Sequence, residues 1–358
     1  MSELPDLGKL PPEIFEEIIY RNLGKKRKEV VVPPRSGVDF GVIELDDKAL
    51  IVKTDPVFVV PEYGWERSSW FAVHILASDV AVSGSPPMYA AIDLNLPKKM
   101  KRDQFEKMWR GISDECERLD ISIVAGHTGK YEGTDYPMIG GMTMLSVAPK
   151  GGYVTTQMAQ PGDVVIMTKG PAIEAAGILA AMFPNVVEKS YGKDFAHAAS
   201  DIFYMQSVVK DAMALSKIGL RTGVTSMHDA TEYGVWGALN DISEASGHGI
   251  IVREEDLFYD EKVEKIMKLF ADLTGKSADL YSSISEGTMV ATVKRNKAEE
   301  AIRILEEGGI RAGVIGEVVD GNYVSLTRKD GSEERIRRPA QDPFWPMFFK
   351  AAEAAKHA

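Results

Sequence analysis

Apolar residues recur along this chain in two patterns, one typical of helices and the other typical of strands. Spacings of three and four predict helices over residues 11–23, 70–82, 103–119, 173–182, 199–216, 261–273 and 297–308, and one that follows residue 231 and ends near 245. Short apolar runs predict strands over residues 41–45, 49–53, 57–60, 89–94, 121–125, 138–147, 164–167, 249–252, 289–294 and 313–319. A hairpin at Asp320-Gly321 is predicted to close the series. This alternation of helices and strands indicates an α/β fold class.

The pattern divides into two units and a tail. Gly151-Gly152 and Pro161-Gly162 bracket the best candidate for a domain junction, because a strand run restarts directly after Asp163. We therefore predict an N-terminal domain over residues 1–155, a C-terminal domain over 156–330 and an aromatic tail over 331–358. The tail aromatics, Phe344, Trp345, Phe348 and Phe349, are expected to dock on the protein's own surface.

Two predicted helices carry unusual residues. Residues 70–82 are apolar nearly all round, which is typical of a buried helix, yet Asp79 lies inside them. Gly84 and Pro86-Pro87 end that helix. In the helix over residues 103–119, Cys116 falls on the apolar face, so we expect it to be a small buried hydrophobe.

Composition and charge exclude several function classes. The chain has 358 residues and a net charge of −11, which argues against sequence-independent binding of nucleic acid. No apolar stretch reaches the roughly 18 residues of a membrane span, and the polar N-terminus is no signal peptide. One cysteine allows neither an intrachain disulfide nor a cysteine zinc cluster, so a cytoplasmic protein is expected. Only five Gln and six Asn occur, a bias that suits a thermophile.

Acidic residues supply the candidate chemistry, since no Walker phosphate loop, Rossmann glycine motif, zincin motif or GxSxG elbow is present. Asp39 follows a glycine in a loop, Asp55 ends a predicted strand, and Asp79 lies in the apolar helix. Converging carboxylates are what Mg²⁺ with nucleotide phosphates requires. The alternative is that Asp79 caps a neighbouring loop, Asp39 is a turn residue and Asp55 is solvated.

Three further positions are open to two interpretations. His127, in Gly126-His127-Thr128-Gly129 after a predicted strand, lies in a loop that could let backbone amides approach a ligand, or in a plain tight turn. The pair His228-Asp229 could bind a ligand, or an N-cap could explain part of it. Glu286-Gly287, after a serine-rich loop, is ambiguous in the same way.

The order of these segments resembles the aminoimidazole ribonucleotide (AIR) synthetase-like ATP-binding superfamily. The most specific match is Ser78-Asp79-Val80-Ala81 followed by Gly84 and Pro86-Pro87, which stands where the family has Asn-Asp-(hydrophobic)-Ala-x-x-Gly-Ala-x-Pro. The other motifs occur in family order, and they are Ser36–Ile43 at the Gly-Asp-Asp-Ala-Ala-Val loop, Thr54-Asp55, Gly126-His127-Thr128, Pro161-Gly162-Asp163, Asp229-Ala230-Thr231 and Ser285-Glu286-Gly287. The chain is most similar to the hydrogenase maturation branch of that superfamily, HypE.

The resemblance implies a fold and a set of site residues. The family has two α/β domains, and the N-terminal sheets of two subunits pair into a homodimer that builds ATP sites at the interface. It implies ATP and Mg²⁺ as cofactors, with Asp39, Asp55 and Asp79 as metal ligands and with Gly37, Asp39, Asp55, His127 and Thr128 binding the nucleotide. Asp79, Asp229 and Glu286 become the catalytic candidates.

The departures from the family pattern shape the functional expectation. Val38 replaces the first Asp of the loop pair, His127 replaces an acidic residue, Glu232-Tyr233 replace Arg-Gly, and no tail cysteine is present. We expect an Mg-ATP-dependent enzyme that activates an oxygen of a small molecule or of a partner protein's modified side chain. The alternative is a nucleotide-binding accessory protein with little turnover in a maturation or metabolic complex.

Overall fold

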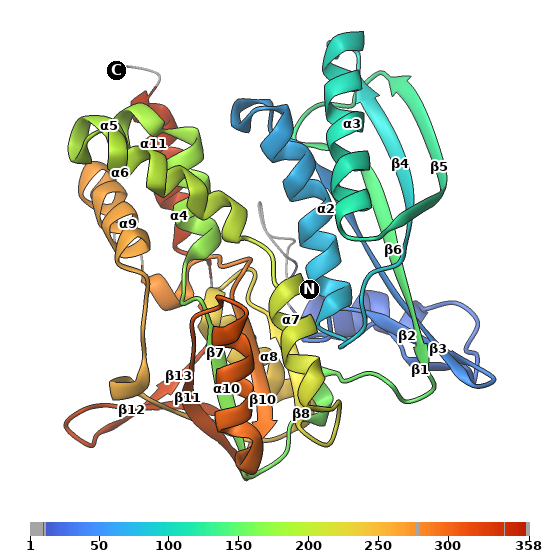
Figure 1. Cartoon of the computed structure of the whole chain (residues 1–358), viewed down its shortest axis with the longest axis vertical. Helices are drawn as coiled ribbons and strands as arrows, with labels where there is room; N and C mark the ends of the chain where they lie inside the picture. Colours follow the sequence, from blue (N-terminus) through green and yellow to red (C-terminus); the bar gives the residue numbers. More distant parts are fainter. Residues whose placement is uncertain (1–9, 11, 277–278, 340, 356–358) are drawn as a thin grey trace.

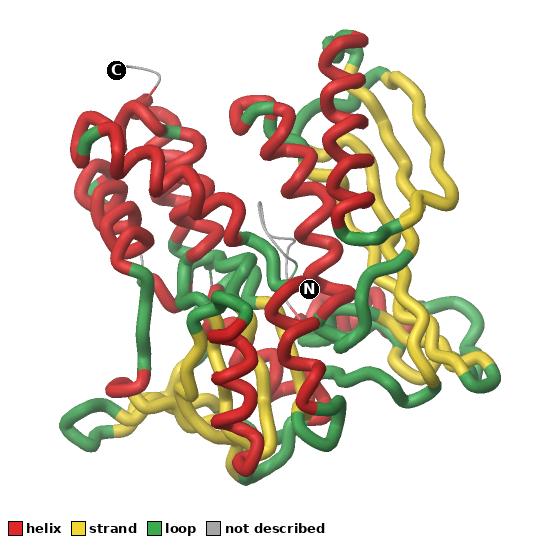
Figure 2. The backbone as a smooth tube through the Cα atoms, viewed as in Figure 1, coloured by secondary structure: helices red, strands yellow, loops and turns green. Residues whose placement is uncertain are grey.

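The computed structural model describes residue 10 and residues 12–276, 279–339 and 341–355. It consists of two β-sheets, each with its own helices, and a separate helical layer above the second sheet (Figure 1; Figure 2). This is the mixed α/β, two-sheet architecture that the sequence predicted. No described helix is both long and apolar enough to cross a membrane.

The first sheet has the strand order β1-β2-β3-β6-β4-β5. All its neighbouring strands are antiparallel except β4 and β5, which are parallel. Helices α2 and α3 cover one face of it, and burial alternates along β4 and β6 because successive side chains point to opposite faces. The bounds of these elements are β1 Val30–Val32, β2 Gly41–Leu45, β3 Lys48–Phe58, β4 Tyr89–Pro97, β5 Ser122–Tyr131, β6 Met138–Pro149, α2 Trp65–Ala81 and α3 Arg102–Arg118.

The second sheet has the order β13-β12-β9-β11-β7-β10-β8. The inner strand β7 and the terminal strand β8 are buried along their whole length because helices pack on both faces of the sheet, with α7 and α10 on one side and α8 on the other. The bounds are β7 Asp163–Thr168, β8 Val224–Asp229, β9 Gly249–Arg253, β10 Met289–Lys294, β11 Ala312–Val319, β12 Val324–Thr327, β13 Glu333–Ile336, α7 Val209–Leu215, α8 Gly234–Ser246 and α10 Ala298–Glu307.

The helical layer has its own apolar core and includes the chain's C-terminal helix. Phe344 and Met347 of α11 are buried in this core, whereas Phe349 remains exposed. The expected docking of the aromatic tail on the protein's own surface is therefore confirmed for Phe344. The helices of this layer are α4 Ile173–Met182, α5 Pro184–Tyr191, α6 Lys193–Ser200, α9 Glu261–Thr274 and α11 Phe344–Ala355.

The two domains share one core at their junction. Val73, Leu76 and Val80 of α2 belong to the same buried cluster as Val208 and Ala212 from the second domain. The hydroxyl of Ser78 on α2 also accepts a hydrogen bond from the backbone N–H of Val208 at 3.0 Å. Helix α2 is thus held between the two sheets, which explains why it is apolar nearly all round. Cys116 is buried, as expected.

The strands predicted over 49–53 and 57–60 form one strand, β3, and four further predicted elements differ from the structure. The helix predicted over 199–216 is broken into the end of α6, a 3₁₀ turn over Asp201–Met205 and helix α7. The turn at Asp320-Gly321 makes no hairpin, because β12 pairs in parallel with β9, and the actual hairpin joins β12 to β13. The described part of the predicted helix over 11–23 comprises α1 Pro12–Ile14, a π-helical turn Phe15–Ile19 and a 3₁₀ turn Tyr20–Asn22, with Ile18 and Leu23 exposed. Residue 11 lies outside the described residues. The fourth difference, in β5, concerns the candidate site.

Candidate functional site

Carboxylates from both domains converge beside helix α2. Asp39 comes from the loop before β2, Asp55 from β3 and Asp79 from the last turn of α2, while Asp229 ends β8 and Glu286 precedes β10. Asp79, Asp229 and Glu286 are buried. The charge of Asp229 acts on the carboxyl groups of both Asp79 and Glu286, and the charge of Asp79 also acts on Glu286. The structure therefore brings the five acidic residues singled out in the sequence into one region, which we call the carboxylate cluster.

A lysine lies inside this cluster. The Nζ atom of Lys53 is 2.9 Å from Oδ1 of Asp79 and 3.5 Å from Oδ2 of Asp55. Burial disfavours the ammonium, but the carboxylates of Asp79, Asp55 and Asp39 outweigh it and hold the pKa of Lys53 above its ordinary value. Lys53 therefore carries a fixed positive charge between two of the predicted metal ligands.

A histidine joins the two domains at the other side of the cluster. Nδ1 of His228 is 2.8 Å from Oδ2 of Asp39, and Nε2 is 3.4 Å from Oδ2 of Asp241 on α8. Burial opposes a charged imidazole, but these two carboxylates raise the pKa of His228 well above its ordinary value. His228 thus bonds the Asp39 loop of the first domain to β8 of the second.

Asp229 and Glu286 are acidic groups with weak compensation, since the one ion pair that either makes within the described residues joins Oδ1 of Asp229 to Nδ1 of His228 at 3.8 Å. Within the described part of the chain, none of their four carboxylate oxygens has a hydrogen-bond partner. Burial is the main cause that raises the pKa of Asp229 to about 6, and the Asp39 carboxylate adds to it while His228 and Lys53 oppose it. Burial, followed by Asp229, likewise raises the pKa of Glu286 well above its ordinary value. Buried carboxylates of this kind are costly unless a cation pairs with them.

A divalent cation fits the part of the carboxylate cluster around Asp39 and Asp229. It does not fit the part around Asp55 and Asp79. Ligand atoms of Asp39, His228 and Asp229 lie within 4.8 Å of one another, and the buried oxygens of Asp229, which accept no hydrogen bond within the described residues, are the hard ligands that Mg²⁺ prefers. His228 already bonds to Asp39, and imidazole is a poor ligand for Mg²⁺. Between Asp55 and Asp79, by contrast, the ammonium of Lys53 takes the position of a cation.

Gly37 has a structural reason to be glycine. Its φ is +72°, and a Cβ there would lie 2.9 Å from the backbone oxygen of Asp241, so the loop carrying Asp39 lies directly against α8. The hydroxyl of Thr156 donates to the carbonyl of Gly37 at 2.5 Å. These contacts fix the loop and hence position Asp39 beside His228.

Within one chain, His127 and Thr128 do not join the carboxylate cluster. The loop predicted at 126–129 is wrong, because these residues lie in the middle of β5. Since β6 and β4 separate β3 from β5, His127 is on the order of 14 Å across the sheet from the strand that carries Asp55. The glycines serve packing here, since a Cβ on Gly126 would lie 2.6 Å from the carbonyl oxygen of Ile92. His127 is exposed and bonds through Nε2 to the Tyr131 hydroxyl at 2.7 Å.

Asp55 also differs from its expected place. It lies inside β3, opposite Met142 of β6, and not at the end of a strand. Residues two apart on a strand share a face, so Lys53 and Asp55 point to the same side. That spacing is the sequence signal by which Lys53 could have been recognised as a site residue. Asp241, 13 residues after His228, has no comparable signal in the sequence.

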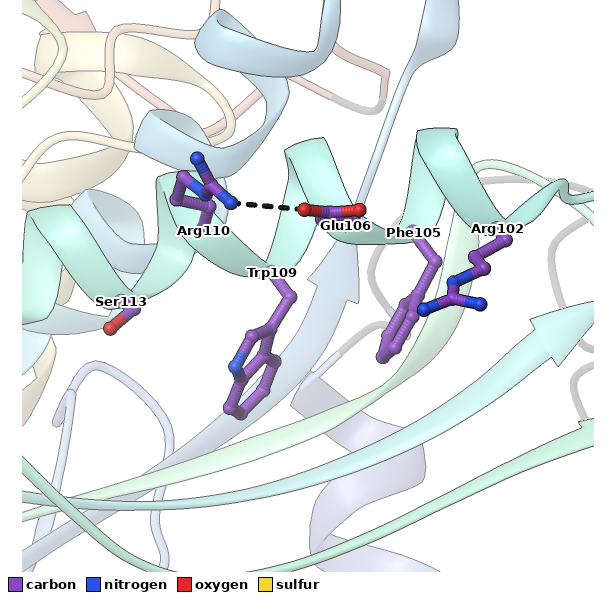
Figure 3. Close-up of a pocket in the computed structure, with 6 residues that line it drawn as sticks. All are labelled: Arg102, Phe105, Glu106, Trp109, Arg110 and Ser113. Atoms are coloured by element: carbon purple, nitrogen blue, oxygen red, sulfur yellow. Dashed lines mark hydrogen bonds and ion pairs between the residues drawn. The ribbon is translucent and has the colours of Figure 1, made fainter.

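A shallow hollow along α3 lies apart from this cluster (Figure 3). Its lining comes from α3 alone, and its one ion pair joins Arg110 to Glu106 at 2.9 Å within the helix. It contains none of the buried carboxylates. The carboxylate cluster therefore remains the candidate functional site.

Comparisons with known proteins agree with this architecture. A "putative hydrogenase expression/formation protein" of Methanocaldococcus jannaschii is 24% identical over 314 residues, which cover 86% of this chain and 88% of the relative. The crystal structure of the HypE–HypF complex contains a chain that superposes with a TM-score of 0.68 at 22% identity, covering 91% of this chain and 99% of that one. The structure of hydrogenase maturation protein HypE in complex with ATP gives a TM-score of 0.65 at 20% identity, covering 93% of both chains.

Two family matches cover most of the sequence. Residues 37–147 match the N-terminal domain, and residues 160–329 the C-terminal domain, of the family described as AIR synthase related protein. Together they span more than half of the chain and contain every residue of the carboxylate cluster. This protein therefore belongs to the AIR synthase related family.

Proposed function

We propose that this protein is an Mg-ATP-dependent enzyme that activates an oxygen atom of a small molecule or of a protein-bound group by phosphoryl transfer. The observation that carries the proposal is Asp229, which is buried beside Asp39 and whose carboxylate oxygens accept no hydrogen bond within the described residues. A divalent cation would relieve the cost of that burial. Family membership and the HypE structure with ATP support a nucleotide as the companion of the cation.

The chain's own groups divide the work of phosphoryl transfer, which consists mainly of positioning and charge neutralisation. Asp39 and Asp229 would hold Mg²⁺, which supplies positive charge against the transferred phosphoryl group. Lys53 supplies a second positive charge from its place beside Asp79. Asp79 and His228 fix Lys53 and Asp39 in position. Glu286, whose pKa is raised, is suited to accept or hold a proton of the acceptor group.

A homodimer is part of this proposal. Strand β5 is an edge strand, and Val124 (59%) and Tyr131 (41%) on it are exposed. An exposed edge of this kind is suited to pairing with a second chain. In such a dimer, His127 and Thr128 would serve the nucleotide site of the partner subunit, which is consistent with their distance from the carboxylate cluster of their own chain.

Two classes of molecule are proposed as the acceptor of the phosphoryl group, a partner protein and a small molecule. The relative from Methanocaldococcus jannaschii and the HypE–HypF complex support a maturation partner protein that presents the group to be activated. A small molecule is the second acceptor class. An exposed aromatic tail would have favoured the alternative of an accessory protein that docks to a partner. Phe344 of the tail is instead part of the protein's own core.

Calorimetric titration with ATP tests the nucleotide site. We expect binding of Mg·ATP at one site per subunit, weaker binding of Mg·AMP and little binding without metal, because the cation neutralises both the phosphates and Asp229. The Asp79→Asn variant should retain its fold and lose most ATP turnover, on the order of 100-fold or more. Asp272→Asn, an exposed position on α9, is the matched control and should behave like the wild type.

Three results would change the proposal. Full turnover by Asp79→Asn would overturn the assignment of the carboxylate cluster as the active site. Tight Mg·ATP binding with no turnover in the presence of either acceptor class would favour the accessory protein. Absence of ATP binding at any metal concentration would overturn both.

A further inference from the structure

The space between two of the predicted metal ligands is filled by a side chain of the protein itself. Nζ of Lys53 lies 2.9 Å from Asp79 and 3.5 Å from Asp55. The Asp79 side chain is only 7% exposed, compared with 21% for Lys53 and 33% for Asp55. The ammonium is therefore the principal counter-charge of a carboxylate that is almost completely removed from water.

The backbone holds this lysine firmly. Lys53 lies in the middle of β3, one residue beyond the pairing of β3 with β2, and its register partner on β6 is Met144. Asp79 lies on α2, which is packed between the two domains. Mg²⁺ requires oxygen ligands at about 2.1 Å, and a second positive charge directly beside it is strongly repelled. A divalent ion and the Lys53 ammonium therefore cannot occupy the space beside Asp79 together.

We infer that Lys53 takes the place of one divalent cation in the proposed nucleotide site, so that the protein uses one metal ion, at Asp229 and Asp39, and a lysine, at Asp55 and Asp79. This inference rests on the proposed function. An ammonium has three donor hydrogens. Two of them face Asp79 and Asp55, which leaves one for an oxygen of the nucleotide's phosphate chain.

The distribution of charge supports one lysine site, at Asp55 and Asp79, and one metal site, at Asp39 and Asp229. The first group, Asp55 and Asp79, already has a cation, because the Lys53 ammonium donates a hydrogen bond to Asp79 and forms an ion pair with Asp55. In the second group Nδ1 of His228 lies 2.8 Å from Asp39 and 3.8 Å from Oδ1 of Asp229, and neither oxygen of Asp229 accepts a hydrogen bond within the described part of the chain. The second group thus keeps capacity for a metal ion, and the first does not.

Counting bound metal tests the inference directly. Mn²⁺ bound per chain is measured by electron paramagnetic resonance, with and without a non-hydrolysable ATP analogue. We expect one Mn²⁺ per chain in the wild type and one more in Lys53→Met, because removal of the ammonium opens the space between Asp55 and Asp79. The double variant Lys53→Met/Asp79→Asn should return to the wild-type count, since it removes the lysine and also the carboxylate that would hold the added ion.

A matched control shows whether the expected gain of one bound Mn²⁺ is specific to Lys53 or follows the removal of another buried lysine as well. Lys169 pairs with Asp211 at 2.9 Å and is similarly buried, so Lys169→Met should keep the wild-type count. Two Mn²⁺ ions in the wild type, or equal counts in the wild type and in a folded Lys53→Met variant, would overturn the inference. The number of Mn²⁺ ions bound by the wild-type chain still tests the inference if the Lys53→Met variant fails to fold.

Failure of the proposed function gives a different result. If the wild type binds Mn²⁺ and no ATP analogue, the proposed nucleotide site is wrong, whereas the metal counts still decide the role of Lys53. If the analogue binds but the counts do not change with Lys53, the nucleotide site stands and the lysine inference falls.

Discussion

At the scale of single residues, buried polar side chains link helix α2 to its neighbours. His74 is the clearest case outside the carboxylate cluster. Its Nδ1 lies 3.0 Å from the hydroxyl of Ser207 in the second domain, and its Nε2 lies 3.4 Å from Glu115 on α3. Its ring also stacks on Trp70, with 4.1 Å between ring centroids. His74 therefore connects α2 both to α3 and to the second domain.

The protonation of His74 should make stability depend on pH. Burial lowers its pKa below the ordinary value, although Glu115 opposes the shift and Lys210 and Arg118 add to it. Below a pH of about 6.5 the unfolded chain then binds a proton that the folded chain does not, so the contribution of His74 to stability is lost as the pH falls. We expect His74→Gln to narrow the difference in melting temperature between about pH 5 and pH 7.5. An unchanged difference would contradict this prediction.

At the scale of elements, a loop and a helix from different domains position the candidate metal ligands. The Gly37 loop contacts α8 at Asp241, Asp241 bonds to His228, and His228 bonds to Asp39. Arg338, beyond β13, forms an ion pair with the same Asp241. The position of Asp39 thus depends on the docking of two domains and on the segment before the C-terminal helix.

Gly37→Ala should disturb this arrangement more than a comparable change elsewhere. Gly24 has nearly the same φ, +73°, but a Cβ there would meet nothing within 4 Å. Gly24→Ala should therefore cost only the backbone strain, about 1 kcal/mol. Gly37→Ala should cost a further ~1–3 kcal/mol from the clash with Asp241 and should weaken Mg·ATP binding by moving Asp39. Urea unfolding and calorimetric titration of both variants measure the two effects, and equal losses in the two variants would contradict the expectation.

At the scale of the whole molecule, the two edges of the first sheet differ. The β5 edge is long, and nearly all its residues are exposed, whereas β1 at the other edge is a strand of three residues. Long exposed edges attract other strands, and short ones do so much less. The proposed homodimer therefore has one suitable edge in this sheet.

Val124→Lys tests that dimer. A lysine at this exposed position on β5 should convert a dimer into monomers, because a charge at the centre of an interface is costly to bury. ATP affinity should fall by about tenfold or more as the His127 and Thr128 side chains are withdrawn from the partner subunit. Val31→Lys on β1, which is also exposed, is the control and should leave both properties unchanged. Light scattering coupled to gel filtration gives the oligomeric state, and a monomeric wild type would contradict the proposal.

The sequence by itself determined most of the elements and the burial of their apolar faces. The helix over 173–182 and the strands over 41–45 and 289–294 have the same bounds in the structure, and Cys116 is buried as the helical spacing predicted. Such features depend on local periodicity, which is written directly in the chain. The collinear motifs likewise indicated the AIR synthetase-like fold and the five acidic residues of the carboxylate cluster.

Tertiary structure alone decided which charges meet. The pairing of Lys53 with Asp79 depends on the packing of α2 against β3, and the pairing of His228 with Asp39 depends on the docking of two domains. The extension of β5 through His127 depends on its register with β4, and the break in the helix predicted over 199–216 depends on the contact between Val208 and Ser78 of α2. Each of these contacts joins residues far apart in the sequence, and periodicity carries no information about them because it describes only near neighbours along the chain.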